Sequence, residues 1–279
     1  MKSPCEIHRR AWLAGAGALL VSPGLALAEG SLARIRERGS LTVGLYQEMP
    51  PFHANGRGID VELGRALAQA MGLKFSPLPF QAGESMNDDL RNMVWKGHYL
   101  GWGPADVLLH VPTDKALAQA NPQVLVLAPY YRERVLLAVQ REQFGRIESL
   151  AELAGHPVAV AGQSMAGWLM AGALPGAAAS GLSTAFADGV DAARALREGR
   201  VQAAAGLASE LESVLGGDTR FALQPLPSPR VPAAGWALGC AVRQDAGELA
   251  AALQEAMQAL QASGRLQAIF AAHQVAWHL

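Results

Sequence analysis

The chain has 279 residues, a formal net charge of −1 and 51% hydrophobic residues. A charge this close to neutral gives no electrostatic basis for binding nucleic acid or an anionic membrane surface, and neither partner is expected. The length allows one large domain or two smaller ones, each with a hydrophobic core.

The first 28 residues have the pattern of an export signal. Arg9 and Arg10 make a basic start, an apolar run follows, and Ala26 and Ala28 form an A-x-A cleavage site. We expect cleavage after Ala28 and a periplasmic protein that begins at Glu29. The segment "HRRAWLA" fits a twin-arginine signal in part and a general secretory signal as well, so both export routes stay open. No later apolar run approaches the ~20 residues that a bilayer crossing needs.

Cys240 is the single cysteine of the expected mature chain, because Cys5 lies in the signal. An intramolecular disulfide is therefore excluded, and packing must supply the stability. The apolar surroundings of Cys240, "GWALGCAV", indicate a buried thiol in a strand rather than a nucleophile.

The mature chain alternates short apolar runs with helical patterns, which is typical of α/β proteins with parallel strands. One predicted helix has Asp60 as its cap and Leu63, Leu67 and Met71 on one face, and it stops at Gly72. Strands are expected at 41–46, 73–80, 105–111, 124–139 and 156–161, in the first half of 201–216, and at 221–227 and 235–243. Helices are expected at 58–72, 86–97, 165–174 and 188–199, and in the second half of 201–216. The helix at 188–199 has Asp188 as its cap and Gly199 as its stop. Two more helices are expected near the C-terminus: one has Leu249, Leu253, Met257 and Leu260 on one face, and the last begins at about Gly264.

Two breaks divide this pattern. Two β-rich runs in 124–139 flank Pro129, Tyr130 and Tyr131, as in a strand that continues from one lobe into another, and residues 225–232 are rich in proline. We therefore expect lobe 1 to contain residues 29–130 and 231–279, and lobe 2 to be inserted as residues 131–230. A cleft between two hinged lobes is a natural site for a small ligand.

The segment "LTVGLYQEMPPFHANGRGIDVELGRALAQAMGLK" resembles the opening of family 3 periplasmic solute-binding proteins. Further matches in the same order are "APYYRERVLLAV", "LAGHPVAVAGQS", "ALREGRVQAA" and "ALQASGRLQAIFAAHQV". The resemblance implies a two-lobed α/β fold, the type II periplasmic-binding fold with two hinge crossovers. It also implies a monomeric, non-enzymatic protein that delivers a small molecule to an ABC permease.

The family holds an amino acid with an arginine after the third strand and an aspartate in the second lobe, since these groups match its carboxylate and ammonium. This sequence has Lys115 nearest the first position and Leu207 at the second. Gln163 and Ser164 retain the polar turn at a helix start, where backbone N–H groups can hold an anion. The ligand is therefore left as a small polar molecule.

The candidate ligand-binding residues combine aromatic, polar and charged side chains. Aromatic faces can sandwich the apolar part of a ligand, although Phe52 and Tyr131 can equally be packing residues. His110 can contact the ligand or make a structural hydrogen bond. The candidates are Tyr46, Glu48, Phe52, His110, Thr113, Lys115, Tyr130, Gln163 and Ser164.

Residues 98–104 are an insert with His98, Tyr99 and Trp102 among glycines. Exposed, the insert would bind a partner protein, because tyrosine and tryptophan favour interfaces; otherwise it folds over lobe 1. The turn "DVLLHVP" is similar to one in the MxaJ/XoxJ-type subgroup, which is associated with quinoprotein alcohol dehydrogenases. An accessory protein of such a dehydrogenase is therefore the alternative function.

Enzyme motifs and metal-ligand spacings are absent from the sequence, so no cofactor and no metal are expected. The acidic segment "NDD" at 87–89 suits a helix N-terminus. One enzyme alternative shares the expected fold, the cyclohexadienyl dehydratases, which need an acid in the cleft. Glu48 is the acid near the mouth of lobe 1 and would have that role.

Overall fold

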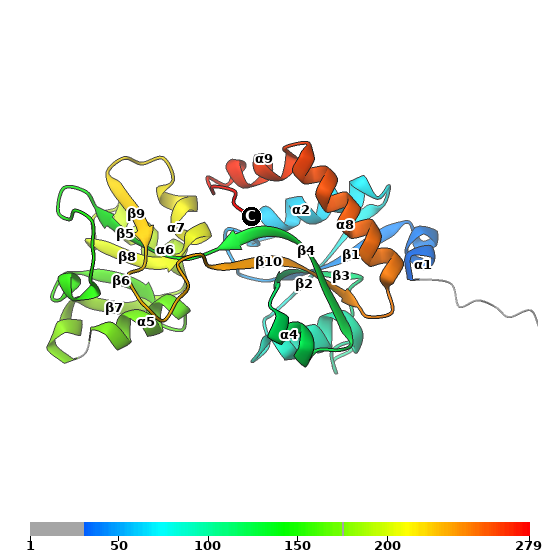
Figure 1. Cartoon of the computed structure of the whole chain (residues 1–279), viewed down its shortest axis with the longest axis horizontal. Coiled ribbons are helices and arrows are strands. Elements are labelled where there is room, and N and C mark those ends of the chain that lie inside the picture. Colours follow the sequence, from blue (N-terminus) through cyan, green and yellow to red (C-terminus); the bar gives the residue numbers. More distant parts are fainter. Residues whose placement is uncertain (1–30, 175) are drawn as a thin grey trace, which may run out of the picture.

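The computed structural model describes residues 31–174 and 176–279. The expected signal peptide, its cleavage site and Cys5 lie outside these residues. The described chain forms two lobes side by side, each with a five-stranded sheet and flanking helices (Figure 1). None of the helices in this part of the chain has the length and apolar content that a membrane crossing requires.

Lobe 1 contains both ends of the described chain. Its sheet has the order β2-β1-β3-β10-β4, with β1 parallel to β2 and β3, and β10 antiparallel to β3 and β4. Its strands are β1 (Ser40–Tyr46), β2 (Lys74–Phe80), β3 (Val107–Pro112), β4 (Val124–Glu133) and β10 (Trp236–Arg243), and its helices are α1 (Ser31–Arg38), α2 (Ile59–Ala70), α3 (Met86–Leu90), the π-helix η1 (Arg91–Trp95), α4 (Lys115–Ala120), α8 (Gly247–Ala262) and α9 (Arg265–Ala272).

Lobe 2 lies between the two halves of lobe 1 in the sequence. Its sheet has the order β7-β6-β8-β5-β9, with β6 parallel to β7 and β8. Its strands are β5 (Val135–Gln140), β6 (Val158–Ala161), β7 (Leu182–Phe186), β8 (Ala203–Leu207) and β9 (Phe221–Pro225), and its helices are α5 (Met165–Ala173), α6 (Gly189–Arg197), α7 (Ala208–Leu215) and the short 3-10 segments η2 (Leu150–Leu153) and η3 (Gly176–Gly181).

Two links join the lobes, one from β4 to β5 and one from β9 to β10 (Figure 1). β4 pairs with β10 as far as Glu133, so the division expected after residue 130 falls inside β4. The links touch where Gly235, at φ 65°, packs on the first link: a Cβ there would lie 1.8 Å from the carbonyl oxygen of Glu133. Glycine is therefore required for this approach.

The core of lobe 1 follows the predicted helical faces. Leu63 and Leu67 of α2 are fully buried, and so are Leu249 and Leu253 of α8. Each buried leucine contributes about 1.5–3 kcal/mol of transfer free energy. Cys240 is also fully buried in β10, as predicted, and burial raises the pKa of its thiol well above the usual value.

Two local predictions were wrong in detail. Asp60 does not cap α2: Gly58 holds that position, and the Asp60 carboxylate is buried inside lobe 1, where it accepts a hydrogen bond. In the second helix Ser85 is the cap, and Asp89 turns inward instead of lying free at the N-terminus. The helix then changes to a π-helix at Arg91, so it is not one regular α-helix.

Candidate functional site

The carboxyl ends of the parallel strands define the candidate site, because open α/β sheets bind ligands outside these ends. In lobe 1, β1 ends at Tyr46 and β3 at Pro112; in lobe 2, β6 ends at Ala161 and β8 at Leu207. The helices that follow β3 and β6, α4 and α5, lie on the same side of the hinge strands, one in each lobe (Figure 1). The predicted polar residues Lys115 and Gln163, at or just before the starts of α4 and α5, therefore belong to segments on the same side of the hinge strands.

The turn of lobe 2 is built by Ser164. Its hydroxyl donates to the carbonyl oxygen of Ala161 at 2.7 Å and accepts from the N–H of Gly167 at 3.0 Å, which caps α5. The hydroxyl is therefore already used within the turn. Gln163 is exposed, and its amide is free to meet a ligand.

Two exposed apolar side chains of α5 were missed by the sequence reasoning. Met165 is 48% exposed and Trp168 is 72% exposed. They stand on the turn of α5 that Ser164 caps. The sequence "MAGWLMAGAL" did not indicate that these side chains would be exposed, because an apolar run of this kind normally predicts a buried helix.

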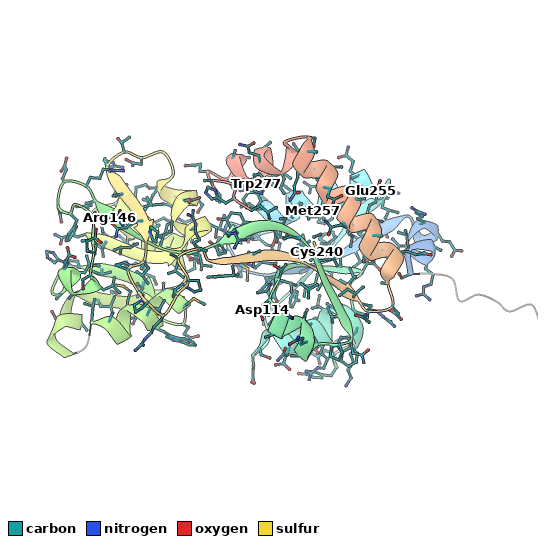
Figure 2. All side chains as sticks on the ribbon, in the orientation of Figure 1. Asp114, Arg146, Cys240, Glu255, Met257 and Trp277 are labelled. Atoms are coloured by element: carbon teal, nitrogen blue, oxygen red, sulfur yellow. The ribbon has the colours of Figure 1, made fainter. Side chains whose placement is uncertain are left out.

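Lobe 1 contributes a second polar turn after β3. The hydroxyl of Thr113 donates to the carbonyl oxygen of Ala237 at 3.3 Å. Asp114, which is labelled in Figure 2, caps α4 by accepting from the N–H of Leu117 at 2.8 Å. Lys115 is exposed at the start of α4. Among these residues, Lys115 has a charge free to meet a ligand.

The expected aromatic platform is not open. The structure buries all four rings, so they act here as packing residues. Tyr131 stacks on Phe270 at 4.7 Å, and Phe52 contacts both rings from the side. The four buried residues are Tyr46, Phe52, Tyr130 and Tyr131.

His110 belongs to a polar cluster inside lobe 1. Its backbone N–H donates to the Tyr130 hydroxyl at 3.1 Å, and that hydroxyl donates to Asp60 at 2.8 Å. His110 Nδ1 lies 3.4 Å from the other Asp60 oxygen, and the ring meets Phe52 edge-on at 4.3 Å. Burial, followed by the nearby Asp60, raises the pKa of Tyr130 well above its ordinary value, so its hydroxyl stays protonated as a donor.

Buried acids at the hinge were not expected from the sequence. Glu133, at the end of β4, accepts hydrogen bonds from the hydroxyl of Ser209 at 2.5 Å and from the N–H of Arg134 at 2.9 Å. Burial raises the pKa of Glu133, and the bonds from Ser209 oppose that rise. Because Ser209 belongs to α7, the bond links lobe 2 to the strand of lobe 1. Glu133 is the acidic residue inside the apolar run "YYRERVLLAV", and that position could have indicated a buried acid.

Glu210 caps the backbone beside the same junction. Its carboxylate accepts from the N–H of Leu207 at 2.8 Å and from the N–H of Gly189 at 3.1 Å. Burial raises the pKa of Glu210 to about 7, against the opposing effect of these two bonds. Leu207, at the position where the family would place an aspartate, therefore has a backbone already engaged.

Glu48 lies on another part of lobe 1. It is exposed after β1 and lines a cavity of about 680 Å³ beside β2, together with His53, Arg65 and Lys74. The structure thus groups Glu48 with this outer cavity rather than with Gln163 and Ser164.

The insert at 98–104 is partly exposed and partly folded over lobe 1, so it combines the two arrangements that were expected as alternatives. Tyr99 is 88% exposed and Leu100 is 69% exposed. His98 stacks on Trp102 with ring centroids 4.0 Å apart, and Trp102 lies 6.3 Å from Phe80 of β2. The tip of the loop is therefore open, while its base folds onto lobe 1.

The described residues include no group of three or more His, Cys, Asp or Glu side chains placed to hold a metal ion. No protein-family model matches the chain, and no curated protein matches it by sequence.

Solved structures resemble the chain over most of its length. An ancestral cationic amino acid solute-binding protein is 19% identical, with a TM-score of 0.66 over 86% of this chain and 98% of that one. An amino acid ABC transporter substrate-binding protein from Streptococcus pneumoniae, bound to L-arginine, is 17% identical with a TM-score of 0.59 (90% and 100% covered). The chain has the two-lobed periplasmic-binding-protein fold. The fold predicted from the sequence is thus confirmed.

An open example of this binding-protein fold is also among the similar structures. The unliganded L-cystine solute receptor of Neisseria gonorrhoeae is 22% identical, with a TM-score of 0.58 over 88% of this chain and 97% of that one. At these identities the likeness shows the fold, and the ligand must be argued from this chain's own residues.

Proposed function

We propose that this protein is a periplasmic solute-binding protein that closes its two lobes on a small polar molecule and delivers it to an ABC permease. The observation that carries the proposal is the pair of links at Glu133–Val135 and Pro225–Trp236, since two separate lobes joined in this way can hinge around a ligand. The similar structures of a solute-binding protein, an ABC transporter substrate-binding protein and an L-cystine solute receptor support it. The export signal expected at residues 1–28 would direct the chain to the same location.

The ligand would bind between exposed groups of the two lobes. Gln163 and the start of α5 offer an amide and backbone N–H groups, and Lys115 offers a positive charge. Trp168 adds an apolar surface. A small polar molecule with an anionic group suits these partners best.

The test is thermal unfolding of the mature protein with a panel of amino acids, short organic acids and simple alcohols. A ligand at ~100 times its dissociation constant should stabilise the folded protein by about 2.7 kcal/mol. Gln163→Ala should weaken the shift, whereas Gln143→Ala, an exposed glutamine of the turn after β5, should leave it unchanged. Absence of a shift with every compound, or equal shifts in both variants, would count against the proposal.

A second candidate is an accessory protein of a periplasmic quinoprotein dehydrogenase, and the exposed tip of the insert favours it. Tyr99 and Leu100 are large apolar side chains held out in solvent by the His98–Trp102 stack. Replacing both by serine should abolish co-elution with such a dehydrogenase and leave the thermal unfolding temperature unchanged. Co-elution that survives the double substitution would remove this candidate.

No observation favours the dehydratase interpretation, because Glu48 lies in the outer cavity beside β2. We therefore propose a protein without catalytic activity.

A further inference from the structure

A second cavity in lobe 1 has a lining unlike that of the proposed solute site. It has a volume of about 510 Å³ and lies where β1 and β2 end, between the segment after β2 and the insert at 98–104. Cavities of this size accommodate small molecules. All its lining residues belong to lobe 1, so the cavity does not depend on how the lobes are placed.

A buried carboxylate lines this cavity. Asp89 is 4% exposed, and its two oxygens accept hydrogen bonds from the Tyr46 hydroxyl at 2.9 Å and from the N–H of Gly83 at 2.7 Å. Two donors and no acceptor around the carboxylate suit its ionised form. Burial nevertheless raises the pKa of Asp89.

The carboxylate lacks a positive partner. Within the described residues no lysine, arginine or histidine forms an ion pair with Asp89, and the lining contains neither lysine nor arginine. A buried charge without a partner is costly, and an opposite charge that enters the cavity would offset that cost. Each carboxylate oxygen still has a lone pair for another donor.

Aromatic rings form the other walls. Phe80 and Trp102 line the cavity with centroids 6.3 Å apart, and His98 stacks on Trp102. The ring faces of tryptophan and phenylalanine attract cations, and the attraction is stronger where water is excluded. The N–H of Leu100 donates to Nδ1 of His98 at 3.2 Å, which fixes the position of the His98 ring in the cavity wall.

We propose that this cavity binds a small organic cation, an alkylammonium or guanidinium compound, with its charge near Asp89 and its alkyl groups against Phe80 and Trp102. The amide oxygens of Gln47, Gln81 and Asn92, which also line the cavity, can accept hydrogen bonds from its N–H groups. The site goes beyond the proposed solute-binding function, because it lies within one lobe and uses none of the residues at Gln163 or Lys115.

The test uses the mature chain and isothermal titration with choline and methylguanidinium as cations. The uncharged isostere of choline, 3,3-dimethylbutan-1-ol, is the ligand control. We expect both cations to bind and the neutral alcohol to bind at least about tenfold more weakly, since it lacks the charge that Asp89 and the rings attract. No measurable binding of either cation, or equal affinity for choline and its isostere, overturns the proposal.

Variants locate the binding. Asp89→Asn should weaken choline binding by about tenfold or more, because it removes the buried charge. Trp102→Leu should also weaken it, and this variant keeps Asp89 and its hydrogen bonds, so the test survives if Asp89→Asn does not fold. Phe144→Leu, which replaces a half-buried aromatic ring of lobe 2 that belongs to neither site, is the matched control and should leave choline binding unchanged.

The outcomes separate this site from the solute site. Binding that is lost in Trp168→Leu or Gln163→Ala but kept in Asp89→Asn and Trp102→Leu belongs to the solute site and overturns the proposal. Choline and methylguanidinium are not in the thermal panel, so their titration tests the cavity of lobe 1 separately from the solute site. Failure of these two cations to bind leaves the solute-binding function intact.

Discussion

Two neighbouring tyrosines of β4 differ in what their hydroxyl groups contact. Tyr130 donates to Asp60 and accepts from the N–H of His110. The hydroxyl of Tyr131 is equally buried but has no hydrogen-bond partner. Since a buried hydroxyl contributes stability only through its partners, the two positions form a matched pair.

Tyr130→Phe should lower the free energy of unfolding by about 1–3 kcal/mol, because it leaves the buried Asp60 carboxylate without its donor. Tyr131→Phe should be neutral or slightly stabilising, because it removes an unpaired buried hydroxyl. Urea unfolding of both variants checks this. Equal losses in the two variants would mean that the hydrogen bonds of the Tyr130 hydroxyl do not supply the expected stability.

Glu210 should make stability depend on pH. Its pKa is about 7 in the folded chain and near 4.5 when unfolded. Between these values the folded state binds more protons, so its stability falls as the pH rises from about 4.5 to about 7, by at most about 3 kcal/mol. Urea unfolding of wild type and Glu210→Gln at pH 5 and pH 8 checks the sign: wild type should lose stability relative to the variant. Parallel pH profiles would contradict the assignment.

The residue scale is where the sequence predicted least. Gln163 and Lys115 are exposed at strand ends as the chain order suggested. Tyr46 and Phe52 occupy the expected positions, but their rings face the core. A sequence places an aromatic residue on a strand end, but the direction of its ring is set by partners such as Asp89, which are distant in the chain.

At the scale of elements, two helices share a cap and differ in burial. Asp188 caps α6 by accepting from the N–H of Asp191 at 2.8 Å, as predicted, and α6 buries six residues. Asp114 caps α4 in the same way, but α4 buries none. Because the two caps make the same hydrogen bond, any difference in what their loss does to stability comes from the tertiary packing of the two helices.

Asp188→Ala should lower the free energy of unfolding by about 1 kcal/mol, the usual effect of losing an aspartate cap. Asp114→Ala should leave global unfolding unchanged, because a helix without buried residues can unfold locally. Chemical denaturation measures the first effect, and hydrogen exchange in 115–120 should show the local opening of α4. A comparable loss in both variants would show that α4 is part of the cooperative unit.

Helices were predicted correctly where the local sequence alone, through hydrophobic periodicity or capping residues, determines them. The face of α8 and the caps and stops of α6 follow from local sequence alone. The prediction was less accurate in 86–97, where the π-helix at Arg91–Trp95 interrupts the regular helix. Met93 and Val94 are buried there, so tertiary packing selects the irregular turn.

At the scale of the whole molecule, the hydrophobic clusters do not cross the hinge. The fully buried clusters of lobe 1 and lobe 2 share no residue, although Trp236 packs partly against both. The two-lobed order was predictable because the breaks near 130 and 225 are local. The polar contacts that join the lobes, such as Glu133 to Ser209, were not, because their residues are 76 positions apart.

Separate cores imply that the lobes can unfold separately, and Cys240 can report on one of them. It is buried in the same lobe 1 cluster as Met257 of α8, and both residues are labelled in Figure 2. It is also the sole cysteine of a chain that begins at Glu29. Its thiol should react with a labelling reagent only when lobe 1 opens. Leu253→Ala in lobe 1 should lower the urea midpoint of Cys240 labelling, since such core truncations cost about 2–5 kcal/mol.

Leu211→Ala is the matched change in lobe 2, because Leu211 is also fully buried in its cluster. It should shift part of the circular dichroism transition to lower urea and leave the midpoint of Cys240 labelling nearly unchanged. If Leu211→Ala shifts labelling as much as Leu253→Ala does, the contacts of Glu133, Arg134 and Ala276 with α7 couple the lobes into one folding unit. Hinge motion would then have to occur without breaking those contacts, which would make α7 part of the hinge rather than of the moving lobe.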